Sequence, residues 1–152
     1  MSKYRDLIDD ATKINEKELM EYYGYSGIFG RFQIRIKFIN SWILHRLAFS
    51  SPHSGFAIRM QRARGVKIGK NCHFNPYAII DLIYPKLVHI ENNVTLGSFS
   101  MIFAHSNPTA NLFLKKGSYP RKVADVTIKS GAVISPGSII TSGVTKIGRA
   151  HV

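Results

Sequence analysis

One histidine of the sequence stands where it could transfer protons. His105 lies three residues after Ile102, at the point where a regular segment gives way to the long stretch 106–122. An imidazole titrates near neutral pH, so a histidine in such a place can serve as a general base when another group orients it. Residues 106–122 contain no acidic side chain that would do so. The competing interpretation is an exposed loop histidine without a catalytic role.

The elements that must position His105 follow a six-residue period. An aliphatic residue opens nearly every unit, and a small or β-branched residue stands four places later, as in Ile128-Lys-Ser-Gly-Ala132-Val. Further units open at Ile68, Phe74, Ile80, Ile90, Leu96, Ile102, Ile134 and Ile140. Such a period is typical of a solenoid in which three short strands close each coil and the opening residues stack inside. The sequence therefore predicts a mainly β fold, a parallel β-helix of hexapeptide repeats.

Two insertions interrupt this period. Between Ile80 and Ile90 there are four residues more than one unit allows, and between Ile102 and Ile128 there are twenty more. Insertions in a solenoid form loops on its outside, and a long loop in a compact domain usually has a function. The longer insertion begins beside His105, so we expect a functional site there.

Residues 1–64 are predicted to form a basic helical segment ahead of the β-helix, which we assign to 65–145. Helices are expected near 5–23, 31–49 and 56–64, each ended by glycine or by a Ser-Pro break. The segment thus differs from the rest of the chain both in its period and in its charge.

Positive charge is concentrated in one part of the chain. The formal net charge is +12, and no acidic residue lies between Glu21 and Asp81, although that stretch is rich in lysine and arginine. This basic stretch is expected to contact an anionic partner. The candidates are a bilayer surface, a nucleic acid and a phosphate-bearing ligand. No helix-turn-helix, zinc pattern or base-stacking module occurs, which disfavours nucleic acid.

The helix expected over 31–49 allows two hypotheses. It carries too many charges to span a bilayer. Its apolar residues occupy several faces, which favours packing between the solenoid and neighbouring subunits. The alternative is a basic helix carrying Trp42 that lies at a membrane interface, a peripheral membrane contact.

Cysteine content and the first residues bear on the compartment. Cys72 is the single cysteine, so no disulfide forms within the chain, and its place in the repeat predicts a small buried side chain. Residues 1–21 contain several acidic side chains, which a cationic targeting segment would avoid. We therefore expect a cytoplasmic protein.

Several segments together resemble a known family. They are Gly65-Val-Lys-Ile-Gly-Lys-Asn71, Tyr84-Pro-Lys-Leu-Val-His-Ile-Glu-Asn-Asn-Val94, Ala104-His105 and Ile128 to Thr145. Over residues 65–145 the sequence resembles the hexapeptide-repeat acyltransferases, especially sugar O-acetyltransferases and the galactoside and maltose acetyltransferases. The resemblance implies a left-handed β-helix, a homotrimer with active sites between adjacent subunits, and acetyl-coenzyme A as the acyl donor.

The resemblance also implies roles for particular residues. His105 would deprotonate an acceptor hydroxyl, which then attacks the thioester carbonyl directly. Ser130, Gly131 and Ala132 match a stretch that contacts the pantetheine arm in the family, and Asp81 falls where the family places an acceptor-binding carboxylate. The acceptor would be a sugar or a glycan-linked hydroxyl. The basic helix, rather than the resemblance, would suit a lipid-linked saccharide made at the cytoplasmic face of a membrane.

The charge of the long insertion suggests where the donor's phosphates bind. Coenzyme A carries a pyrophosphate and a 3′-phosphate, and basic residues are suited to bind them. The candidates within 106–122 are Lys115, Lys116, Arg121 and Lys122. A solvated cationic loop is the alternative for any one of them.

Three other functions are compatible with a solenoid of this kind. A γ-class carbonic anhydrase binds zinc through three histidines, two of them separated by four residues, but the position five after His105 is Ala110, which argues against a metal site. A serine acetyltransferase-like enzyme would share the chemistry. A non-catalytic scaffold would predict that His105→Ala changes nothing.

The repeat loses its register at the end of the chain. An aliphatic residue should open a unit at position 146, but Lys146 stands there and Ile147 follows one place late. The six residues Ile147-Gly-Arg-Ala-His-Val152 also match the translation of a common sequencing adapter. We therefore expect 146–152 to be an artefact and the gene to be truncated near Thr145. Coils that contact coenzyme A in the family would then be missing, and the chain could be inactive.

Overall fold

The computed structural model describes the backbone of residues 2–148 and the side chains of 12–111 and 113–148. All three helices expected from the sequence form, as α1 (Ser2–Tyr23), α2 (Gly27–Ser50) and α3 (Ser54–Ala63). Gly24, whose φ of 70° suits only glycine well, follows α1 directly. His53 caps α3, because its Nδ1 accepts the backbone N–H of Phe56 at 3.2 Å.

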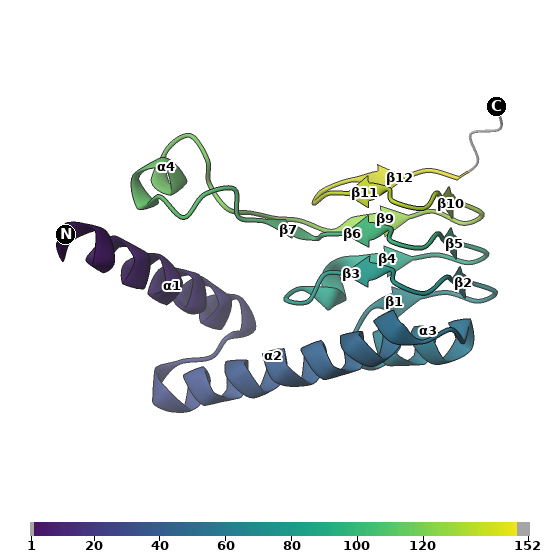
Figure 1. Ribbon diagram of the computed structural model, residues 1–152, viewed down its shortest axis with the longest axis horizontal. Helices are drawn as coiled ribbons and strands as arrows, with labels where there is room; N and C mark the ends of the chain where they lie inside the picture. The colour runs from purple at the N-terminus through teal and green to yellow at the C-terminus, as the bar shows by residue number, and fades with distance from the viewer. Residues whose placement is uncertain (1, 149–152) are drawn as a thin grey trace. The chain divides into compact units, whose positions relative to one another are not determined.

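Short parallel strands follow the helices and form the solenoid, which Figure 1 shows as stacked coils. One sheet has the order β1-β4-β9-β12, a second β10-β5-β2 and a third β11-β6-β3. Their bounds are β1 (Lys67–Ile68), β2 (His73–Phe74), β3 (Ile79–Ile80), β4 (Val88–Ile90), β5 (Thr95–Leu96), β6 (Met101–Ile102), β9 (Val126–Ile128), β10 (Val133–Ile134), β11 (Ile139–Ile140) and β12 (Thr145–Lys146). The predicted parallel β-helix is confirmed.

The strand register confirms both insertions. Thr127 pairs with Thr145, three six-residue units later, which is the length of an uninterrupted coil. Lys67 pairs with His89, so that coil contains the four extra residues, which include the 3-10 helix η1 (Pro85–Leu87). His89 pairs in turn with Thr127, and that coil contains the twenty extra residues.

The residues that open the units form the core. Ile80, Leu96, Ile102 and Ile128 are fully buried inside the solenoid. Burying a side chain of this size stabilises the fold by about 1.5–3 kcal/mol, so stacking of coils is the main source of stability. Cys72 is half-buried, with its Sγ 3.1 Å from the carbonyl oxygen of Glu91.

The end of the solenoid keeps the ladder but not the apolar pattern. Thr145 and Lys146 form β12, in which Lys146 pairs with Ile128 and takes the place expected for an aliphatic residue. Of the segment that we expect to be an artefact, residues 149–152 lie outside the described residues.

The chain divides into two compact units. One contains residues 1–39 and 107–121, with α1, the first part of α2 and the short helix α4 (Leu112–Lys116). The other contains residues 40–106 and the chain from 122 onward, with the rest of α2, α3 and the solenoid. In the described part of the chain, no helix has the length and apolarity needed to cross a membrane.

Candidate active site

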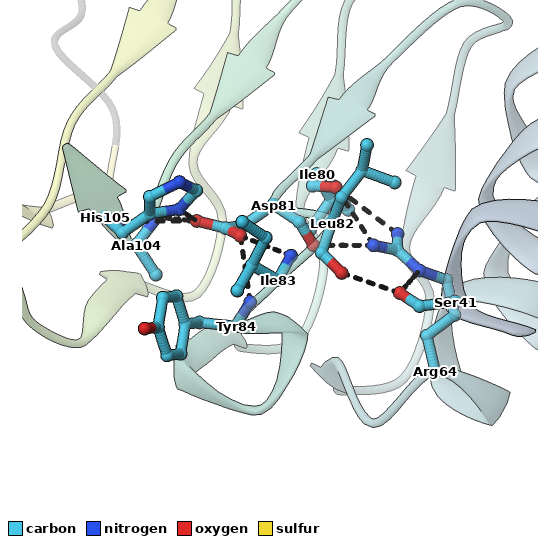
Figure 2. A network of polar contacts seen from close by, with 9 residues as sticks. All are labelled: Ser41, Arg64, Ile80, Asp81, Leu82, Ile83, Tyr84, Ala104 and His105. Atoms are coloured by element: carbon cyan, nitrogen blue, oxygen red, sulfur yellow. Dashed lines mark hydrogen bonds and ion pairs between the residues drawn. The ribbon is translucent and has the colours of Figure 1, made fainter. Parts of the chain in front are cut away.

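His105 forms a close pair with a buried aspartate. Its Nδ1 lies 2.6 Å from Oδ2 of Asp81, whose side chain has no solvent exposure, while the His105 side chain is 20% exposed (Figure 2). The imidazole is therefore held by one ring nitrogen and open to solvent on another side. The orienting carboxylate lies outside residues 106–122, which contain no acidic side chain.

The Asp81 carboxylate is fixed by the backbone on both of its oxygens. Oδ2 also accepts the N–H groups of Ala104 at 2.8 Å and of His105 at 3.1 Å. Oδ1 accepts those of Ile83 at 2.8 Å and Tyr84 at 2.9 Å. Burial raises the pKa of Asp81, but the hydrogen bonds from the His105 ring and from the amides of Tyr84 and Ile83, with the charge of His105, outweigh it and lower the pKa below its ordinary value. Asp81 is thus ionised at neutral pH.

The coil register brings Asp81 and His105 together. Asp81 follows β3 directly and its N–H donates to the carbonyl of Ile102 in β6 at 2.9 Å, so the residues that follow Ile102 pass beside it. Both insertions begin at this place, one coil apart. The Asp81 carboxylate binds the first residues of both, and so determines where each leaves the solenoid.

A buried arginine lies on the other side of the Asp81 backbone (Figure 2). Arg64, just after α3, donates through Nη2 to the carbonyl oxygen of Asp81 at 2.5 Å and to that of Ile80 at 3.3 Å. Its Nε donates to Oγ of Ser41 at 3.1 Å, and that hydroxyl donates to the carbonyl of Leu82 at 2.7 Å. Three successive carbonyls, of residues 80 to 82, are therefore held by α2 and α3.

The same arginine contacts a second histidine. Nη1 of Arg64 lies 3.1 Å from Nδ1 of His45 and also donates to Oε1 of Gln61, whose Nε2 lies 3.2 Å from the same Nδ1. Burial and the positive charge of Arg64 lower the pKa of His45 to about 4. A neutral imidazole with Nδ1 as the acceptor satisfies both donors, which explains why the ring stays uncharged.

Tyr84 completes the immediate surroundings of His105. Its ring is almost fully buried and meets the imidazole edge to face, with ring centroids 5.4 Å apart. Beyond His105 the chain forms β7 (His105–Ser106), which pairs antiparallel with β8 (Lys122–Val123) at the base of the long insertion. The histidine is thus held by a carboxylate, an aromatic ring and a strand pair.

This arrangement can perform general base chemistry. Because Asp81 is ionised, Nδ1 of His105 carries the proton that it donates to the carboxylate. Nε2 then bears the lone pair, and it lies on the side of the ring away from Asp81 (Figure 2). A substrate hydroxyl reaching Nε2 could give up its proton there, and the resulting imidazolium would be stabilised by Asp81.

The acceptor-binding role that we expected for Asp81 stays a prediction. In the described structure its carboxylate is fully buried and bonded to its own chain. Its contact with His105 gives it a further role, because it orients the imidazole. The signal was present in the sequence, because Asp81 follows Ile80 as Phe103 follows Ile102, and residues in register one coil apart are neighbours.

The other predicted site residues have surroundings of their own. Lys115 is 8% exposed, and its ammonium binds Glu18 at 2.9 Å and Oδ1 of Asn15 at 2.6 Å, whereas Lys116 is exposed. The N–H and hydroxyl of Ser130 both donate to the Glu91 carboxylate, at 2.9 and 3.0 Å.

The glycine and alanine that follow Ser130 form a corner of the solenoid. Gly131 has a φ of 75° and space around it, and Ala132 is buried in the core. Of the two, only Gly131 therefore leaves room for a ligand at this corner.

A second histidine–aspartate pair lies on the outer face of the sheet that contains β4 and β9. His89 Nε2 is 2.9 Å from Asp125 Oδ1, in a groove of about 690 Å³ that is also lined by Lys67, Gly69, Glu91 and Thr127. No motif in the sequence points to a role for His89. Among the described residues, no three side chains of His, Cys, Asp or Glu come close enough to hold a metal ion.

Comparison with known proteins identifies the fold. The sequence matches no protein-family model and no curated protein. Among solved structures, the hexapeptide-repeat-containing acetyltransferase of Vibrio cholerae, complexed with acetyl-coenzyme A, matches with a TM-score of 0.50 and 14% identity, over 74% of this chain and 70% of that chain. A second crystal structure of that enzyme matches with the same score and identity, over 74% and 73% of the two chains.

A galactoside acetyltransferase in complex with coenzyme A also matches, with a TM-score of 0.42 and 17% identity, over 76% of this chain and 74% of that chain. From the Vibrio cholerae structures, the chain shares the fold of hexapeptide-repeat acetyltransferases.

Proposed function

We propose that the protein is an acetyl-coenzyme A-dependent O-acetyltransferase whose general base is His105. The observation that carries this proposal is the His105–Asp81 pair, in which a buried ionised carboxylate holds the imidazole by Nδ1 and leaves Nε2 for a substrate. The shared fold with an acetyltransferase that binds acetyl-coenzyme A supports it.

The reaction proceeds by direct attack. Nε2 of His105 removes the proton of an acceptor hydroxyl as its oxygen bonds to the thioester carbonyl carbon, giving a tetrahedral intermediate and an imidazolium. The carbon–sulfur bond then breaks, the electron pair leaves on sulfur, and the imidazolium returns the proton to the thiolate. Asp81 stabilises the positive charge of the ring in between, and no acyl-enzyme forms.

For the donor, we propose contacts at the corner formed by Ser130, Gly131 and Ala132. Binding of the pantetheine arm there requires Glu91 to release the N–H and hydroxyl of Ser130. The hydrogen bond from Lys129, with those from the N–H and hydroxyl of Ser130, lowers the pKa of Glu91 below its ordinary value. Of the two adjacent lysines in the long insertion, exposed Lys116 is the better candidate for binding a phosphate, because the charge of Lys115 is engaged by Glu18.

We propose a homotrimer with a left-handed winding, as the family resemblance implies, acting in the cytoplasm on a sugar or a saccharide carried by a lipid. Large apolar side chains exposed on the outer faces of the solenoid, Val133 and Ile139, support self-association. Light scattering of the purified protein would measure the mass, and a monomer at micromolar concentration would contradict the trimer.

The decisive experiment measures thiol release from acetyl-coenzyme A across a panel of acceptors, with mass spectrometry of the products. The panel contains mono- and disaccharides, lipid-linked saccharides and L-serine, so that a serine acetyltransferase is recognised by its acceptor. We expect acetylation of a sugar hydroxyl that His105→Ala abolishes. If neither the wild-type protein nor His105→Ala binds acetyl-coenzyme A, and no acceptor is turned over, the result would support a scaffold instead.

A further inference from the structure

Helix α2 presents two apolar faces, and only one of them is covered by the protein. Ile34, in its first half, and Ala48, in its second half, are buried, as are Ser41 and His45 between them. The exposed large apolar residues include Ile28, Phe29, Phe32, Ile36, Ile39, Ile43 and Leu47. We call these seven residues the α2 stripe.

The α2 stripe follows one line along the helix. With 3.6 residues per turn, its members fall on one face, opposite Ile34 and Ala48. From Ile28 to Leu47 the stripe is about 28 Å long at 1.5 Å per residue. Ile28 is 86% and Phe32 63% exposed. A continuous surface of this size and apolarity indicates an interaction site.

Basic residues lie along one border of the α2 stripe. Helical spacing places Arg35 and Arg46 there, whereas Lys37 falls beyond the opposite border, close to the covered face that includes Ala48. Arg35 makes a 3.5 Å contact with Glu16 but remains 68% exposed, and Lys37 lies over the Tyr23 ring. Helix α2 contains no acidic residue. Trp42, half exposed, lies next to the border of Arg35 and Arg46.

We propose that the α2 stripe binds the surface of an anionic lipid bilayer, with the helix lying in the interface. An apolar face inserted about 5–10 Å, with basic residues at the level of the headgroups and an aromatic residue beside them, is the arrangement of interfacial helices. A second copy of α2 has no acidic residue to pair with Arg35 and Arg46, whereas anionic headgroups provide that charge. This proposal does not rest on acetyl transfer.

Vesicle flotation tests the proposal with the full chain. We expect it to float with vesicles of phosphatidylglycerol and phosphatidylcholine in equal parts, to float far less with phosphatidylcholine alone, and to be released by salt. Phe32→Glu should lower the partition coefficient more than about tenfold. Arg35→Gln and Arg46→Gln should each lower it about fivefold.

The matched control is Phe113→Glu. Phe113 is an exposed aromatic residue, 84% accessible against 63% for Phe32, on the short helix α4 and outside the stripe. Circular dichroism establishes that each variant folds. The proposal is overturned if the wild-type protein floats with neither kind of vesicle, or if Phe113→Glu lowers binding as much as Phe32→Glu. It is also overturned if Phe32→Glu changes the mass in light scattering while vesicles have no effect, since the stripe would then join copies of the chain.

Discussion

The solenoid contains two histidine–aspartate pairs of similar geometry and very different surroundings. His105 and Asp81 are 2.6 Å apart, and His89 and Asp125 are 2.9 Å apart. Asp81 is fully buried and accepts backbone N–H groups on both oxygens, whereas 66% of the Asp125 side chain is exposed. His105 is bound by Nδ1 and His89 by Nε2, so the nitrogens left over differ as well.

The difference shows that a histidine–carboxylate contact alone does not define a site. An exposed ion pair contributes little, because water solvates both partners and the side chains are free to separate. A carboxylate held by four backbone amides cannot move, so it determines the ring orientation and the tautomer of its histidine. Only the His105 pair, at the start of both insertions, meets this condition.

Exchanging the two histidines for alanine should produce the largest contrast. Loss of a general base costs about 10²–10⁴ in rate, so His105→Ala should lower kcat by that factor. His89→Ala removes the other paired histidine and should leave kcat within about twofold. Thiol release from acetyl-coenzyme A measures both. Equal losses in the two variants would remove the distinction between the pairs.

The two aspartates provide the next contrast. Asp81→Asn keeps the shape but can accept on one atom only, so amides now bound lose a partner, at about 1–3 kcal/mol for each group. It also weakens the hold on the Nδ1 proton, and kcat should fall about a hundredfold. Asp125→Asn should change stability by less than about 0.5 kcal/mol. Urea unfolding and thiol release measure the two effects.

Acid should separate the wild-type protein from Asp81→Asn. The pKa of Asp81 is lower in the fold than its ordinary value of 3.8. Its stabilisation is therefore present above about that pH and is lost as the pH falls through the lower folded value. The wild-type protein should lose stability steeply at the acid end, and Asp81→Asn should lose less. If the acid limbs of the two proteins have the same slope, Asp81 is not the group responsible.

Two arginines close in sequence, Arg64 and Arg62, allow the same contrast between a buried and an exposed residue. Arg64 is buried and donates to the carbonyls of Ile80 and Asp81, and exposed Arg62 donates to those of Ile68 and Gly69. Arg64→Met should lower kcat about tenfold with little change in KM, by displacing Asp81. Arg62→Met should leave both constants within about twofold.

A purely structural role for Arg64 is distinguished by the pH dependence. If Arg64 positions Asp81, and through it His105, the pH–rate profile of Arg64→Met should shift. Arg64→Lys should recover only part of kcat, because an ammonium cannot reproduce the planar fork of the guanidinium. A loss of stability without a shift of the profile would contradict the positioning role.

The period of the repeat made the solenoid and the location of His105 predictable. An inward position every sixth residue requires an apolar side chain, so Ile80 and Ile102 could be placed in the core, and a break in the period marks a loop. The contact of His105 with Asp81 depends on which units of successive coils pair. Ile80 pairs with Ile102, and the first insertion lengthens the coil between them. The family resemblance assigned the aspartate to the acceptor and gave no indication of this contact.

Charge was a weaker guide than period. Arg64 and Lys115 belong to stretches that we expected to meet an anionic partner outside the chain, yet Arg64 binds backbone carbonyls and Lys115 binds Glu18. Their partners lie 17 and 97 positions away, beyond any local pattern. Apolar residues on two sides of α2 likewise could not indicate which side the protein covers.

A third histidine, His45, has the opposite surroundings to His105. Its Nδ1 faces a cationic donor and an amide donor, whereas Nδ1 of His105 faces a carboxylate. The pKa of His45 in the fold is about 4, against an ordinary value of 6.5. The unfolded chain therefore takes up a proton between those values while the folded chain does not, and stability should fall by roughly 2–3 kcal/mol as the pH drops from 6.5 to 4. His45→Gln keeps an acceptor that does not titrate, so its thermal midpoint should depend less on pH.

His73→Gln removes an exposed histidine on β2 and controls for histidine number. Parallel curves for His45→Gln and the wild-type protein would mean that His45 is charged in the fold.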